Sequence, residues 1–307
     1  MIKPSYLKKG DTVAIVSTAR KISPEEIEPA ITLLKSWGLK VVVGKTIGAA
    51  ENQFAGSEAF RASDMQQMLD NPEIKAIWCA RGGYGSVQII DRLDWTTFKK
   101  QPKWIVGYSD VTVFHSQLHT LGFETIHAEM AMDITKKTGL TKSSLRNALF
   151  GKIHKIKYEL PDNSGRTGIA KGLLVGGNLS VLYSLCGSAS SIDTRGKILF
   201  IEDLDEYLYH IDRMMQNLKR NGKLDGLAGL IVGGMNSMRD NTQAFGFNTD
   251  NPYGKTIKEI INEAIAGYDF PVCFDFPAGH IENNLALVFG REVELKVSDK
   301  GQLKFMD

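Results

Sequence analysis

Cysteine is scarce in this sequence, and its placement limits the chemistry the protein can use. Cys79, Cys186 and Cys273 lie far apart, each inside an apolar segment. An odd number of separated thiols favours reduced, buried side chains over a disulfide framework or a zinc site. We therefore assign the cysteines no function.

An excess of one charge is also missing. The 307 residues include 37 Lys and Arg against 35 Asp and Glu, which gives a formal net charge of +2. No basic run is interleaved with aromatic residues, so the electrostatic footprint of a nucleic-acid-binding protein is absent. We expect no nucleic acid among its partners.

Long hydrophobic runs are absent as well. No segment approaches the ~20 consecutive apolar residues that span a bilayer. Residues 1–18 lack the long apolar core and small-residue cleavage site of a signal peptide. We therefore expect a cytoplasmic protein without a membrane partner, and a chain of this length suggests about two domains.

Alternating strand and helix patterns fill the first half of the chain. Residues 12–18 form a β-branched apolar run, after which Ser23 can act as an N-cap and Glu26 can complete a capping box. Further apolar strands follow, beginning with residues 74–80. This alternation predicts an α/β domain over residues 1–150 with a mainly parallel, wound sheet.

The pattern changes after residue 150. Residues 151–172 are polar and rich in turn-forming residues, which is typical of an inter-domain linker. Residues 173–307 contain strands separated by glycine turns and two helices, and form the predicted C-terminal domain. One helix, 205–221, carries apolar residues on one face: Leu208, Ile211, Met215 and Leu218.

The segment WIVGYSDVTVFH, residues 104–115, predicts a strand that turns sharply into a helix with Ser109 at the corner. Such a corner exposes a side chain beside the free N–H groups of the helix, where a nucleophile can work. Gly107 fits a nucleophile elbow, but Val111 occupies the second small position. On this segment alone, helix capping by Ser109 or Asp110 is the simpler interpretation.

Glycines 82, 83 and 85 follow the apolar strand that ends near Arg81. Their exposed N–H groups could bind an anion or a developing oxyanion. A phosphate loop is the alternative, but the segment lacks both the G-x-G-x-x-G spacing and the lysine of a P-loop.

Carboxylate and imidazole candidates lie in the second half. Glu202 and Asp203 end an apolar strand, where wound sheets present functional side chains. Capping of the next helix would account for Asp203 or Asp205 but leaves Glu202 unexplained. His280 follows a tight Pro-Ala-Gly stretch and is the histidine least like core filler.

His115 and His119 lie four residues apart, a spacing that permits metal binding. No glutamate completes an H-E-x-x-H pattern. Packing or hydrogen bonding at the domain interface is therefore the preferred interpretation over zinc.

Five motifs in order resemble the LD-carboxypeptidase A family, which also includes the microcin C7 self-immunity peptidases. They are RGGYG at 81–85, GYSDVT at 107–112, GGNLS at 176–180, IEDLDEYLYHIDR at 201–213 and GHIENN at 279–284. The resemblance covers nearly the whole chain. It implies a flavodoxin-like N-terminal domain, a C-terminal swivelling β/β/α domain and a homodimer.

The resemblance also implies a Ser-Glu-His triad. It assigns the nucleophile to Ser109, the orienting carboxylate to Glu202 and the general base to His280, the same three residues singled out above. The oxyanion hole would be formed by the N–H of Asp110 with one from the Gly82-Gly83 turn. This chemistry needs no metal or organic cofactor.

Residues 127–130 depart from the family pattern, because His-Ala-Glu-Met stands where many relatives have His-Gly-Pro-Met. Glu129 adds a possible anion near the substrate. Arg81 is a candidate for binding a free terminal carboxylate, as are the glycine N–H groups. Tyr84 and Asn178 complete the predicted substrate-binding set.

By resemblance, the substrate is a cytoplasmic murein tetrapeptide that loses its terminal D-alanine during peptidoglycan recycling. One alternative is a peptidase of the immunity type that cleaves aminoacyl-nucleotide conjugates, with Trp78 or Tyr84 as its aromatic platform. Another is a non-catalytic protein that binds small peptides.

Overall fold

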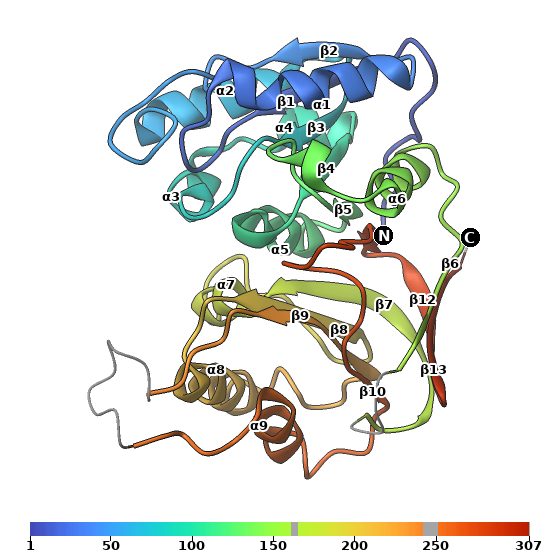
Figure 1. The fold of residues 1–307 in the computed structure, drawn as a ribbon. Coiled ribbons are helices and arrows are strands. Elements are labelled where there is room, and N and C mark those ends of the chain that lie inside the picture. The colour runs from blue at the N-terminus through green and yellow to red at the C-terminus, as the bar shows by residue number, and fades with distance from the viewer. Residues whose placement is uncertain (161–164, 242–250, 307) are drawn as a thin grey trace. The chain divides into compact units, whose positions relative to one another are not determined.

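The computed structural model describes residues 1–160, 165–241 and 251–306, which form two compact units (Figure 1). Unit 1 comprises Met1–Ile153 and Glu282–Gly290, and unit 2 comprises His154–Ile281 and Arg291–Asp307. Within the described ranges, every helix is too short or too polar to cross a bilayer.

The division differs from the predicted one in two ways. The predicted linker, 151–172, contains strand β6 (Lys155–Glu159) and the start of β7 (Gly168–Asn178), although its residues 161–164 lie outside the described residues. The predicted C-terminal domain includes Glu282–Gly290, which belongs to unit 1. This segment places β11 (Leu287–Phe289) antiparallel to β5 at the edge of the first sheet.

Unit 1 is built on a sheet in the order β11-β5-β4-β3-β1-β2. The order 2-1-3-4-5 of its parallel strands is the flavodoxin-like doubly wound arrangement. Its sheet confirms the wound parallel fold predicted for the N-terminal half. The parallel strands are β1 (Thr12–Val16), β2 (Lys40–Val43), β3 (Ile74–Cys79), β4 (Trp104–Gly107) and β5 (Thr125–His127).

Helices connect these strands. The capping box before α1 is confirmed, because Ser23 N donates to Glu26 Oε2 at 2.7 Å and Glu26 N donates to Ser23 Oγ at 3.3 Å. Gly38, with φ of 81°, adopts the left-handed conformation that ends this helix. The helices are α1 (Pro24–Ser36), α2 (Glu58–Asp70), α3 (Ser86–Ile89), α4 (Thr96–Lys100), α5 (Thr112–Thr120) and α6 (Gly139–Leu149).

Unit 2 contains a second sheet in the order β10-β9-β8-β7-β12-β13-β6. Strands β7 to β10 are parallel, whereas β12, β13 and β6 continue the sheet in antiparallel fashion. This separate α/β unit agrees with the predicted second domain. Its remaining strands are β8 (Ile198–Leu204), β9 (Gly229–Asn236), β10 (Val272–Cys273), β12 (Glu292–Val297) and β13 (Lys300–Phe305).

Helices α7 (Leu179–Ser184), α8 (Leu208–Arg220) and α9 (Ile257–Ala264) accompany this sheet, and Figure 1 shows α8 and α9 side by side. Ile211, Met215 and Leu218 are buried in the core of the unit, as their spacing predicted. Burying side chains of this size stabilises the fold by about 1.5–3 kcal/mol each.

We predict that Ser23→Ala lowers the free energy of unfolding by about 1 kcal/mol, because it removes the acceptor that caps α1. Ser36→Ala is the matched control, since the Ser36 hydroxyl bonds only to the Leu33 carbonyl within the same helix. Denaturant unfolding measures both variants. Equal losses in the two would contradict the capping account.

Candidate active site

Ser109 stands at a strained corner of unit 1. Strand β4 ends at Gly107, and Ser109 begins a 3-10 turn, Ser109–Val111, that leads into α5. Its φ is 60°, in the left-handed region that non-glycine residues seldom occupy. Such strain persists where the surrounding structure holds it, and it is common at functional sites. The half-buried Ser109 therefore occupies a strand-to-helix turn of the nucleophile-elbow type.

The departure of Val111 from the elbow pattern has a local explanation. A Cβ at Gly107 would lie 2.8 Å from Val111 Cγ2, so the glycine makes room for the valine. The structure does not support the capping interpretation of this segment. Neither the 3-10 turn nor α5 has a side-chain cap, and the Asp110 carboxylate bonds elsewhere.

Asp110 connects the elbow to the glycine loop, residues 82–85, which follows β3. Its Oδ2 accepts a hydrogen bond from Ser86 N at 2.9 Å, and burial raises the pKa of this carboxyl. A Cβ at Gly82 would lie 3.5 Å from Asp110 Cβ, so the two backbones are close neighbours. Gly83 has a φ of 101°. The structure thus brings together the residues predicted to form the oxyanion hole.

Arg61, which was not predicted from the sequence, holds the same loop through hydrogen bonds to backbone carbonyls. Its side chain is buried, and Nη1 donates to Thr18 O at 2.7 Å and to Gly85 O at 2.9 Å. Nη2 donates to Gln88 Oε1 at 2.7 Å. Burial lowers the pKa of the guanidinium. No local pattern around this mid-helix arginine could reveal carbonyl partners so distant in sequence.

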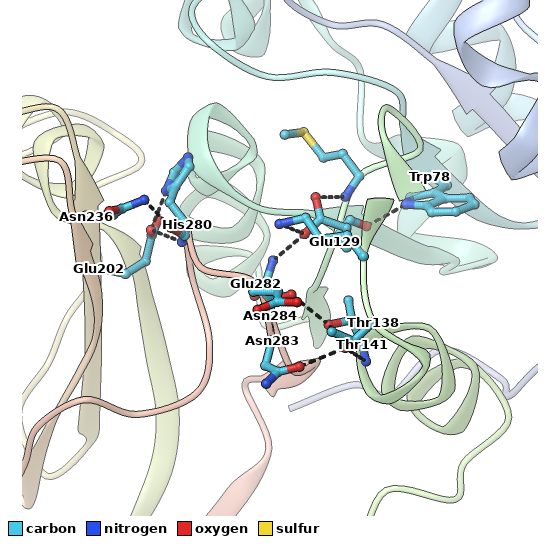
Figure 2. A network of polar contacts seen from close by, with 12 residues as sticks. Trp78, Glu129, Thr138, Thr141, Glu202, Asn236, His280, Glu282, Asn283 and Asn284 are labelled. Carbon is cyan, nitrogen blue, oxygen red and sulfur yellow. Dashed lines mark hydrogen bonds and ion pairs between the residues drawn. The ribbon is translucent and has the colours of Figure 1, made fainter. Parts of the chain in front are cut away.

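Glu202 and His280 form a hydrogen-bonded pair in unit 2 (Figure 2). Glu202 is fully buried on β8, and its Oε2 accepts from His280 Nδ1 at 2.6 Å and from His280 N at 3.2 Å. Asn236 Nδ2 donates to the His280 carbonyl at 3.2 Å. With Nδ1 donating, a neutral imidazole carries its lone pair on Nε2, the tautomer a general base needs.

Gly279 makes this pairing possible. Its φ is 105°, and a Cβ there would lie 2.8 Å from Glu202 Cβ and 2.9 Å from Glu202 Oε2. The glycine is therefore required both by backbone conformation and by the close approach of the carboxylate.

Asp203 has a different partner from its neighbour Glu202. It accepts from Asn178 Nδ2 at 2.9 Å and from Ser180 N at 2.8 Å, and α8 has no side-chain cap. The alternative interpretation, capping of α8 by Asp203 or Asp205, is therefore wrong. Burial, followed by the charge of Glu202, raises the pKa of Asp203 to about 7. Asn178, predicted to bind substrate, has its amide bonded within this network.

Glu129 is buried rather than exposed to solvent. Its Oε2 lies 3.0 Å from Lys137 Nζ and accepts from Asn284 Nδ2 at 3.2 Å, as Figure 2 shows for Asn284. Trp78 is also buried, and its Nε1 donates to the Glu129 carbonyl at 2.8 Å. These contacts balance the charge of Glu129 within unit 1, and its predicted role in substrate binding stays a prediction.

The other predicted binding residues flank the glycine loop. Arg81 Nη1 donates to the Lys21 carbonyl at 2.9 Å. The Tyr84 side chain is 47% exposed, and its ring tilts against Phe54 with 6.2 Å between centroids. Of the two aromatic candidates, Tyr84 alone is exposed.

His115 is a hydrogen-bonding histidine. Its Nε2 lies 2.9 Å from Gly107 O and its Nδ1 lies 2.8 Å from Thr125 Oγ1, while burial lowers its pKa to about 4. Among the residues whose placement is described, no three His, Cys, Asp or Glu side chains are arranged to hold a metal ion.

Comparison with known proteins identifies the family of the chain. Residues 13–128 match the LD-carboxypeptidase N-terminal domain and residues 171–295 match the C-terminal domain. These matches define a peptidase, a hydrolase of peptide bonds. The chain belongs to the LD-carboxypeptidase family, as its motifs indicated.

Two curated relatives and one solved structure illustrate the family. The chain is 33% identical to the probable murein peptide carboxypeptidase of Bacillus subtilis, over 97% of this chain and 92% of that protein. It is 26% identical to the microcin C7 self-immunity protein of Escherichia coli, over 96% and 93%. The crystal structure of muramoyltetrapeptide carboxypeptidase from Oxalobacter formigenes shares the fold, with a TM-score of 0.85, 24% identity and coverage of 96% and 99%.

We predict that Gly279→Ala weakens the Glu202–His280 hydrogen bond, because the added methyl group displaces the carboxylate. Gly187→Ala is the matched control, since Gly187 also has a positive φ, 83°, but no atom within 4 Å of a Cβ. The Nδ1 proton resonance of His280 reports the bond. A resonance unchanged in Gly279→Ala would contradict the predicted clash.

The pH dependence of the stability of the fold should include a contribution from Asp203. The folded protein retains a proton on Asp203 that an unfolded chain releases above about pH 4. This stabilising contribution is therefore present at low pH and is lost as the pH rises toward 7.

Glu202→Gln should lower the pKa of Asp203, because a neighbouring like charge is removed. The pKa should stay above its ordinary 3.8, because burial, the larger cause, remains. Carboxyl NMR titration measures both proteins. Glu206→Gln is the control, with a smaller expected shift, and an unchanged Asp203 pKa in Glu202→Gln would exclude the coupling.

Proposed function

We propose that the protein is a serine LD-carboxypeptidase that releases terminal D-alanine from murein tetrapeptides. The observation that carries this proposal is the 2.6 Å hydrogen bond between His280 Nδ1 and buried Glu202 Oε2. The positive φ of Ser109 at the end of β4 supports a nucleophile in unit 1. The proposal requires these three residues to act as one triad.

In the proposed reaction, His280 Nε2 takes the proton of Ser109 as Oγ attacks the peptide carbonyl between the diamino acid and D-alanine. Glu202 holds the ring in its useful tautomer and stabilises the imidazolium. His280 then gives the proton to the leaving amine of D-alanine. Water, activated by the same imidazole, hydrolyses the acyl-enzyme and regenerates Ser109.

The oxyanion would bind the N–H of Asp110 and an N–H of the Gly82-Gly83 turn. The bond from Ser86 N to Asp110 Oδ2 holds this loop beside the elbow. A preorganised donor of this kind lowers the barrier by about 3 kcal/mol in comparable sites. Arg61, through its bond to the Gly85 carbonyl, keeps the loop in place before substrate arrives.

The proposed substrate follows from family membership and from the B. subtilis relative, whose name specifies a murein peptide. Murein fragments recovered by the cell are cytoplasmic, so we place the enzyme in the cytoplasm, in peptidoglycan recycling. We also propose a homodimer, as the family resemblance implies.

A second candidate is cleavage of aminoacyl-nucleotide conjugates, as in an immunity peptidase. The observation in its favour is the exposed ring of Tyr84 beside the glycine loop, on which a base could stack. A purely peptide-binding role is less well supported, because a binding protein has no need of a buried carboxylate bonded to an imidazole.

The test is mass spectrometry of the protein incubated with L-Ala-γ-D-Glu-L-Lys-D-Ala or its meso-diaminopimelate counterpart. We expect wild type to remove one alanine, and Ser109→Ala and His280→Ala to lose at least about 10³-fold in kcat, as in comparable triads. Glu202→Gln should be severely impaired as well. Cleavage of an aminoacyl nucleotide alone would favour the second candidate.

A second imidazole–carboxylate pair provides the control. His210, on α8, has its Nδ1 2.5 Å from Oε2 of Glu206, which precedes the helix. We expect His210→Ala and Glu206→Gln to retain turnover. Activity that depends on Glu206 and not on Glu202, or a folded Ser109→Ala protein with wild-type activity, would refute the proposed triad.

A further inference from the structure

We propose that Arg20 binds the terminal carboxylate of the substrate, an inference that rests on the proposed carboxypeptidase function. A carboxypeptidase must distinguish a free chain end from an internal peptide bond. A guanidinium group does so through paired N–H donors that match the two carboxylate oxygens.

The place of Arg20 in the fold suits a ligand-binding residue. It follows the carboxyl end of β1, while the glycine loop follows the carboxyl end of β3. The order 2-1-3-4-5 reverses between these two neighbouring strands. In wound sheets of this kind, ligands bind outside the strand ends at that reversal.

Arg20 lies directly against the glycine loop. A Cβ at Gly83 would lie 2.6 Å from Arg20 Nε and 2.7 Å from Arg20 Cδ. Only a glycine allows this contact. The φ of 101° at Gly83 is a second reason for glycine, because other residues rarely adopt it. The arginine backbone is anchored, because Ser17 Oγ donates to the Arg20 carbonyl at 2.6 Å.

The spacing matches the substrate. Gly83 is next to Gly82, whose Cβ position is 3.5 Å from Asp110 Cβ. Consecutive Cα atoms of a peptide are ~3.8 Å apart. The terminal carboxylate of the substrate is one residue beyond the carbonyl that is attacked. With the oxyanion at Gly82 and Asp110, the carboxylate lies within about one residue of this site, a distance that Arg20 beside Gly83 can span.

The charge of Arg20 is available for a ligand. Its side chain is exposed, and in the described part of the chain it forms no ion pair with an acidic residue. Arg61, in contrast, is buried and bonded to protein carbonyls. Arg81, the arginine selected from the sequence, donates Nη1 to the Lys21 carbonyl.

The experiment compares two tetrapeptides, one with a free D-alanine carboxylate and one ending in D-alaninamide. Wild type should prefer the free acid. We expect Arg20→Ala to raise KM for the acid about 10- to 100-fold, the loss expected for a charge-assisted contact, with kcat changed less than about 3-fold. The preference for acid over amide should largely disappear, and Arg20→Lys should restore part of it.

Lys21→Ala is the matched control, because it removes a neighbouring exposed positive charge and should keep the preference. An unchanged KM in Arg20→Ala would overturn the assignment. So would an equal loss on both substrates, which would indicate a structural role. If wild type cleaves the terminal residue from neither peptide, the proposed function itself fails, a result distinct from loss of discrimination by Arg20→Ala alone.

Discussion

The hydrogen bond between His280 and Glu202 organises the polar end of β8 in unit 2. It fixes the imidazole to a carboxylate that is fully buried on β8. The same bond determines which ring nitrogen carries the proton. Gly279 has no side chain because any Cβ there would collide with the carboxylate. One contact therefore explains the residue type at three positions.

A comparable constraint organises the strand ends of unit 1. Asp110 extends from the elbow to the N–H of Ser86, and Arg61 extends from α2 to the carbonyls of Thr18 and Gly85. Both charged groups are buried and hydrogen-bonded. They fix the glycine loop through contacts at Gly85 and Ser86, next to the Gly82-Gly83 turn that we propose as part of the oxyanion hole. Binding groups arranged in advance in this way stabilise a transition state without the cost of reorganisation.

The sequence predicted those features that depend on local patterns. The capping box at Ser23 and the wound parallel sheet follow from short-range residue types, and family motifs indicated Glu202 and His280. The return of Glu282–Gly290 to the first sheet was not predictable, because the three-residue strand β11 has no periodicity to detect. Arg20 and Arg61 were missed for another reason: their contacts join loops far apart in sequence.

In the proposed mechanism, Ser109 carries the acyl group during turnover. The most direct measurement is tandem mass spectrometry of the digested enzyme after rapid acid quenching with the murein tetrapeptide. We expect a tripeptidyl adduct on Ser109 that forms as D-alanine is released. In Glu202→Gln, slower hydrolysis should trap a larger amount of this adduct. An adduct on another residue, or D-alanine release that persists when Ser109 is replaced by alanine, would contradict the proposed mechanism.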